Sequence, residues 1–158
     1  MSALFDIGGG EMRVGEMSFH EKRTWIAALS ALVGYAAYAV VVLGRAGGGP
    51  LSGVAYQWPL VWSTVLSVVV TVALVVVVSA LAPKEAGAED ERDRDINRFG
   101  EHVGQGFVAL GAVAALALAL LDVGGFWIAN AVYLALVLSA VVGAAAKLVA
   151  YRRGVHGW

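Results

Sequence analysis

Four stretches of about 20 apolar residues constrain this chain more than any other feature. They cover residues 25–44, 59–82, 103–121 and 126–150, and Lys147 is the one charged residue within them. A hydrocarbon core of about 30 Å needs about 20 helical residues to cross it. The second stretch is rich in valine, yet it is too long for a strand, which rarely exceeds about ten residues. The sequence therefore predicts an all-α integral membrane protein, a four-helix up-down bundle.

The distribution of charge agrees with this fold and predicts an orientation. Charged residues make up 15% of the chain, whereas soluble domains carry about 25%. Of the 11 lysines and arginines, only Arg45 lies in the first or third connection. The others precede the first span, separate the second from the third, or end the fourth. The positive-inside rule then predicts a multi-pass protein of the inner (cytoplasmic) membrane with both termini in the cytoplasm.

The N-terminal region does not resemble a cleaved signal peptide. The first apolar stretch follows about two dozen mixed residues, and it is longer than the apolar region of a signal. We expect residues 1–21 to form a flexible segment and residues 22–158 to form the membrane domain. Met17 is an alternative start for the protein.

Small residues at four-residue spacing predict where the helices approach each other. Membrane helices associate through close packing and buried polar contacts, because lipid tails are as apolar as leucine. The connection at residues 122–125 is too short for anything but an antiparallel hairpin of the third and fourth spans. The predicted packing positions are Gly34, Gly104, Gly111 and Gly143.

A row of hydroxyl groups in the second span has two interpretations. Ser63, Ser67 and Thr71 lie at four-residue spacing, and with Lys147 they could line a polar path through the membrane. Alternatively, each hydroxyl donates a hydrogen bond to a carbonyl of its own helix, and this bond satisfies its hydrogen-bonding capacity.

Aromatic residues lie near the predicted ends of the spans. Trp and Tyr favour the headgroup level, where an apolar ring and a polar tip are both accommodated. We expect membrane anchors at these positions, with a ligand-binding cage as the alternative. They are Trp25 and Tyr151 on the inner side, and Tyr56, Trp58, Trp62, Phe126 and Trp127 on the outer side.

The connection at about residues 83–102, here called the arm, is the one strongly polar segment. Its charges form opposite-sign pairs at helical spacing, and an apolar stripe continues from it into the third span. The arm is therefore predicted to be helical, with a hinge at Gly100, Gly104 and Gly106. The stripe consists of Ile96, Phe99, Val103, Phe107 and Leu110.

The arm has a functional and a neutral interpretation. It could dock a cytoplasmic protein or form a homodimer contact, or it could be a solvated, self-neutralising run of charge. Its alternating signs do not suit binding of lipid headgroups along the arm, which needs uncompensated basic charge. The predicted partner-binding residues are Asp90, Glu91, Arg92, Asp95 and Arg98.

The sequence shows no pattern typical of an active site. It has no cysteine, and His20, His102 and His156 all lie outside the depth of the spans, where they could not hold a haem. No phosphate-binding loop, nucleophile elbow or zinc-binding helix motif is present. A net charge of -1 does not suit nucleic acid. We predict no catalytic, cofactor-binding or metal-binding residues.

The run Asp90-Glu91-Arg92-Asp93-Arg94-Asp95-Ile96 resembles the Asp-Glu-Arg-Asp-x-x-Ile motif of small four-helix bacterial, actinobacterial-type membrane proteins of unknown function. Two further runs, at residues 126–133 and 147–154, are similar to members of that family. The resemblance implies no activity. Helix-turn-helix regulators encoded beside some members imply a regulatory partner.

Taken together, these features predict a non-enzymatic membrane protein that acts through helix–helix or cytoplasmic partner contacts. The alternative is a small dimeric transporter or channel.

Overall fold

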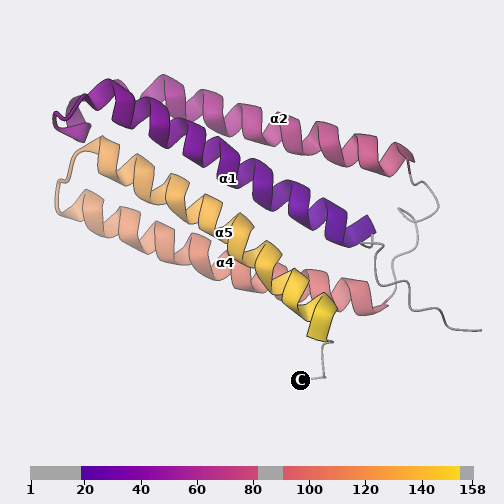
Figure 1. The fold of residues 1–158 in the computed structure, drawn as a ribbon. Helices are drawn as coiled ribbons and strands as arrows, with labels where there is room; N and C mark the ends of the chain where they lie inside the picture. The colour runs from indigo at the N-terminus through magenta and orange to yellow at the C-terminus, as the bar shows by residue number, and fades with distance from the viewer. Residues whose placement is uncertain (1–18, 82–90, 154–158) are drawn as a thin grey trace, which may run out of the picture.

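The computed structural model describes residues 19–81 and 91–153. They form four long helices and one short 3-10 helix (Figure 1). All four long helices are long and apolar enough to cross a membrane, which confirms the predicted membrane bundle. Most of the predicted N-terminal segment and the first part of the arm, including Asp90, lie outside the described residues. The elements are α1 (Phe19–Ala46), η1 (Leu51–Gly53), α2 (Gln57–Leu81), α4 (Glu91–Leu120) and α5 (Gly125–Arg153).

The helices alternate in direction, so the bundle has two distinct ends. We call the end where α1 and α4 begin the terminal end, and the end that holds η1 and the α4–α5 turn the loop end (Figure 1). At the loop end, Gly47 and Gly48 have φ of 53° and 88°, a left-handed conformation that glycine adopts without strain. Nearby, Arg45 donates from Nη1 to the Ala55 carbonyl at 3.0 Å. These features reverse the chain from α1 into α2.

The turn between α4 and α5 is tight, as its length predicts. Asp122 has φ 52°, and its N–H donates to the Ala119 carbonyl at 3.1 Å. The next N–H, of Val123, donates to the Leu118 carbonyl at 3.0 Å. This pair of bonds is the Schellman arrangement, which satisfies carbonyls at a helix end. The predicted antiparallel hairpin of the third and fourth spans is confirmed.

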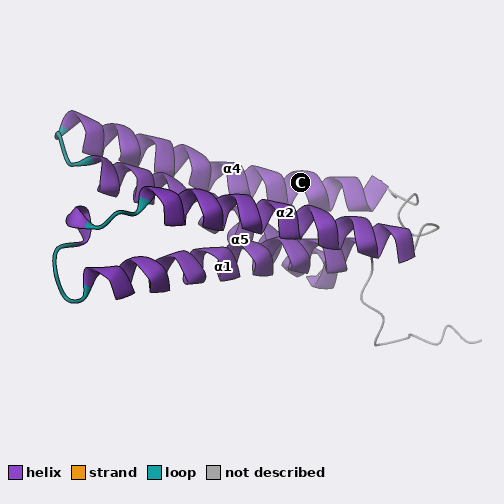
Figure 2. Ribbon diagram, turned by 90° about the horizontal axis from the view of Figure 1, so that it is seen from above, coloured by secondary structure: helices purple, strands orange, loops and turns teal. Residues whose placement is uncertain are grey.

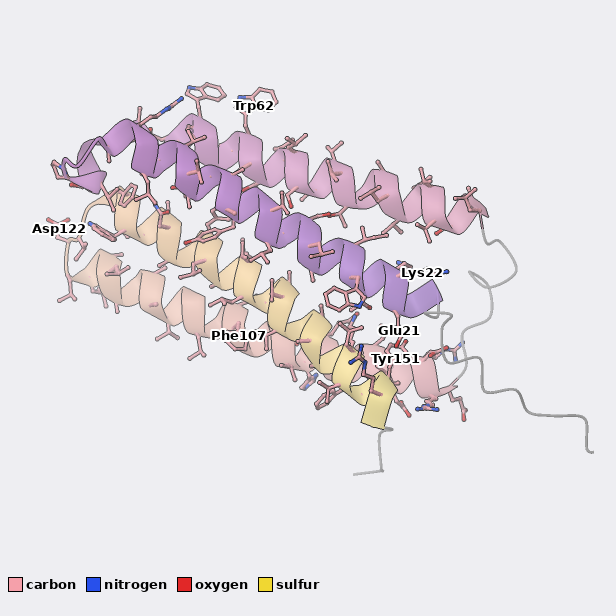
Figure 3. The ribbon with its side chains drawn as sticks, viewed as in Figure 1. Glu21, Lys22, Trp62, Phe107, Asp122 and Tyr151 are labelled. Carbon is pink, nitrogen blue, oxygen red and sulfur yellow. The ribbon has the colours of Figure 1, made fainter. Side chains whose placement is uncertain are left out.

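The four helices pack as a row in the order α2, α1, α5, α4 (Figure 1). The view at right angles places α1 and α4 on opposite sides, so the row is staggered (Figure 2). The end members α2 and α4 have no extensive contact with each other. As a result no residue of α2 is buried, and Trp62 projects away from the bundle (Figure 3). The bundle is open between α2 and α4.

The core of the protein lies in the half near the loop end. Tyr38 is only 3% exposed, and its hydroxyl donates to Oδ1 of Asn130 at 2.8 Å. The Asn130 amide donates in turn to the Phe126 carbonyl at 2.8 Å. This chain of bonds ties α1 to the first turns of α5. The core residues are Tyr38, Val42, Phe126, Tyr133 and Val137.

One of the predicted membrane anchors, Phe126, is packed inside the protein instead, and Tyr56 is half-buried against it. Phe126 is 6% exposed, and its ring meets that of Tyr56 edge-on at 5.1 Å. The physical reason is that η1 packs against both α1 and α5, which brings the start of α2 over the first turn of α5. Trp58 and Trp62 remain 71% and 65% exposed, so membrane anchoring stays a prediction for them.

The second half of the arm is helical and forms one helix with the third span. α4 runs without a break through Gly100, Gly104 and Gly106, so all three are helical, and a hinge at these positions stays a prediction. The residues of the predicted apolar stripe lie on this helix, but they do not all face the bundle, because Phe99 is 47% and Leu110 is 67% exposed. Glycines take their place, since they let α5 approach closely. The buried residues of α4 are Ile96, Gly100, Gly104 and Gly111.

Candidate functional site

A groove of about 650 Å³ lies in the half of the bundle near the terminal end. All four long helices contribute to its lining, and Thr71 and Val75 of α2 lie across it from the residues of α4 and α5. We call it the terminal groove. Its size falls within the range of about 300–1,000 Å³ that is typical of small-molecule sites.

Close contact between α4 and α5 builds the floor of the terminal groove. A Cβ on Gly104 would lie 3.0 Å from the Ser139 carbonyl oxygen, and a Cβ on Gly143 would lie 2.9 Å from the Gly100 carbonyl oxygen. The space beside Gly100 is already occupied by the side chain of Lys147. The absence of a side chain at residue 100 therefore lets the Lys147 stem lie flat on α4.

Three charged side chains line the groove: Arg23, Glu101 and Lys147. The Lys147 ammonium lies 3.9 Å from Oε1 of Glu101. The lysine side chain is 19% exposed and that of Glu101 is 66% exposed. An ion pair at this distance with one solvated partner is weak. Glu101 therefore balances the charge of the half-buried lysine only in part.

The lining also includes three amide and serine side chains: Asn97 and Gln105 from α4 and Ser139 from α5. Within residues 19–81 and 91–153, none of these side chains makes a hydrogen bond. Amide and hydroxyl groups in a groove of this kind can donate to a bound ligand. The terminal groove thus combines two cations, one anion and unused donors.

The sequence identifies Lys147 as a candidate polar residue, but it does not identify Asn97, Gln105 or Ser139 as site residues. Asn97, Glu101 and Gln105 lie at four-residue spacing, so they share one side of α4. The spacing therefore predicts that the three side chains share a helix face. It does not predict that this face lines a groove, because that depends on the position of α5.

The predicted partner-binding residues within the described chain lie on the other side of the arm. Arg92, Asp95 and Arg98 are exposed. Glu91 is exposed as well and takes part in an interaction inside the protein. None of these residues lines the terminal groove, so the groove and the arm surface are separate features.

The predicted polar path is divided in the structure. Thr71 and Lys147 line the terminal groove, whereas Ser63 lines a second groove of about 340 Å³ between α1 and α2. Ser67 donates to the Ser30 carbonyl of α1 at 2.9 Å, and Thr71 donates to the Ser67 carbonyl at 2.8 Å. The hydroxyls are therefore engaged with backbone carbonyls.

The four predicted packing glycines all face a neighbouring helix. Gly34 of α1 lies against Ser67 of α2, where a Cβ would be 3.0 Å from the serine Cβ. Gly111 faces Ala135 across the α4–α5 contact. Gly104 and Gly143 belong to the groove floor described above.

Neither metal-binding groups among the described residues nor similarity to known proteins identifies a function for the terminal groove. Among the described residues, no group of three or more His, Cys, Asp or Glu side chains could hold a metal ion. Comparisons with protein-family models, curated proteins and solved structures find no match.

Proposed function

We propose that this protein is a non-enzymatic membrane adaptor whose arm docks a cytoplasmic protein. One observation carries the proposal: α4 continues unbroken from Glu91 through the membrane-length segment to Leu120. Ile96, one turn into the helix, is 0% exposed. The described part of the arm is therefore fixed to the bundle by packing, and it presents a preformed surface.

The geometry of the helix separates the packed and free faces of the arm. Ile96, Gly100 and Gly104 recur every four residues and face α5. Asp95, Arg98 and His102 follow at spacings of three and four on the opposite side, and all are exposed. Phe99, 47% exposed, lies beside them. An aromatic ring surrounded by charges of both signs suits a protein partner, where aromatic and arginine side chains anchor binding.

The charge distribution supports a cytoplasmic position for this surface. Arg45 is the only lysine or arginine of the described residues that belongs to the loop end. The positive-inside rule assigns the basic end to the cytoplasm. The basic side chains described at the terminal end are Lys22, Arg23, Arg92, Arg94, Arg98, Lys147 and Arg152.

The test is recovery of a partner from gently solubilised native membranes with the tagged full-length protein. We expect Arg92→Glu/Arg98→Glu to lose the partner. The matched control is Lys22→Glu/Arg152→Glu, which makes the same charge change at exposed positions of the same end, outside the arm. Equal recovery with both variants would contradict the proposal.

A photo-crosslinking residue locates the contact independently. Placed at Phe99, it is expected to crosslink the partner. Placed at Leu116, which is 60% exposed in the apolar part of α4, it is expected to crosslink no protein. Crosslinks from Leu116 alone, to a second copy of the chain, would favour a homodimer instead.

The terminal groove is the one observation that favours a small dimeric transporter or channel, because it reaches Thr71 from the terminal end. Against this, the hydroxyl row beyond Thr71 is hydrogen-bonded. We therefore rank transport second.

A further inference from the structure

We propose that the terminal groove binds the anionic headgroup of a phospholipid from the surrounding membrane. This inference does not depend on the proposed docking surface, because none of Glu91, Arg92, Asp95 and Arg98 lines the groove.

The position of the groove suits a lipid. Arg23 and Thr24 come from the first turns of α1, and Lys147 comes from the last two turns of α5. The polar part of the groove therefore lies where the spans end, at headgroup level. Farther from the helix ends the lining is mixed, with Ala27 and Val75 beside Thr71 and Ser139.

The chemistry of the lining suits an anion. The groove holds two cationic side chains and one carboxylate. Arg23 takes part in a further interaction inside the protein, whereas the carboxylate paired with Lys147 is 66% exposed and 3.9 Å from the ammonium. Basic pockets between membrane helices are the kind of site that takes anionic headgroups. Asn97, one helical turn from Glu101 on α4, can add a neutral donor to phosphate oxygens.

The position of Lys147 is built into the helix contact. Its stem fills the space beside Gly100, and its side chain is only 19% exposed. A lysine on a lipid-facing surface would extend freely to the interface. This one is held over the floor of the groove by the α4–α5 contact, so its ammonium is preorganised for a ligand.

The experiment compares lipid retention by the purified full-length protein in native mass spectrometry. Phosphatidylglycerol and phosphatidylcholine are supplied in equal amounts. We expect several-fold preferential retention of phosphatidylglycerol by the wild type, and loss of that preference in Lys147→Gln. Lys147→Arg should retain it, because it keeps the charge. The matched control Lys22→Gln removes an exposed cation at the same end outside the groove (Figure 3) and should leave the preference intact.

A second variant keeps the proposal testable if Lys147→Gln fails to fold. Ala27→Phe fills the groove from α1 without changing charge, and it should also reduce phosphatidylglycerol retention. Equal retention of the two lipids by the wild type would overturn the proposal, as would identical behaviour of Lys147→Gln and Lys22→Gln. Displacement of the lipid by inorganic phosphate alone would show that the site takes a free anion, which would also overturn it.

Discussion

Gly111 of α4 lies directly against Ala135 of α5, and the space that a Cβ on Gly111 would need is already filled by the Ala135 methyl group. Gly111 is buried in the contact, and Ala135 is 7% exposed. This pair sets how closely the two helices of the hairpin approach.

Gly111→Ala is therefore expected to destabilise the protein by about 1–3 kcal/mol, the usual cost of overpacking. The measurement is the free energy of unfolding in detergent micelles. Gly106→Ala is the matched control, because a Cβ at Gly106 of the same helix meets nothing within 4 Å. The double variant Gly111→Ala/Ala135→Gly should recover most of the loss. Equal effects at Gly106 and Gly111 would show that the close contact does not set stability.

The hydrogen bond from Tyr38 to Asn130 links α1 to α5 at 2.8 Å. Tyr38→Phe should lower the free energy of unfolding by about 0.5–1.5 kcal/mol, as expected for one intramolecular hydrogen bond. Tyr35→Phe serves as the control, since the Tyr35 hydroxyl makes no hydrogen bond within the described residues. A loss of equal size at Tyr35 would show that removing a tyrosine hydroxyl, rather than breaking the bond to Asn130, lowers the stability.

The division of the hydroxyl row predicts unequal access to water. In this cysteine-free chain, Thr71→Cys and Lys147→Cys should react with a membrane-impermeant thiol reagent applied from the terminal end, because both positions line the terminal groove. Ser67→Cys should not, since Ser67 faces Ser30 and Gly34 of α1. Rapid labelling at Ser63, Ser67 and Thr71 together would reveal a continuous path and support transport.

Orientation can be measured with two single cysteines at exposed positions. Ser52 lies in η1 at the loop end, and Arg152 lies in the last turn of α5. In intact cells, we expect Ser52→Cys to react with an impermeant reagent. Arg152→Cys should react only after the membrane is permeabilised. The reverse labelling pattern would place the arm outside the cell, and it would contradict the proposal that the arm binds a cytoplasmic protein.

The sequence by itself determined the number of helices and their approximate extents. Charge in a bilayer is so costly that spans appear as long uncharged stretches, whatever their neighbours are. Connection length was also decisive at residues 122–125, where four residues leave no choice but a hairpin. These are local properties, and they can be read from the chain without knowing what each helix touches.

Only the tertiary structure decided the order of the row and the contents of the terminal groove. All four spans are apolar on every side, so hydropathy does not indicate which face of a membrane helix meets a partner. Small residues mark candidate contact faces on each helix, yet they do not indicate which neighbouring helix packs against each face. Phe126 was assigned to the membrane surface and proved to be core. Asn97, Gln105 and Ser139 line one groove only because glycines let α4 and α5 approach at backbone distance.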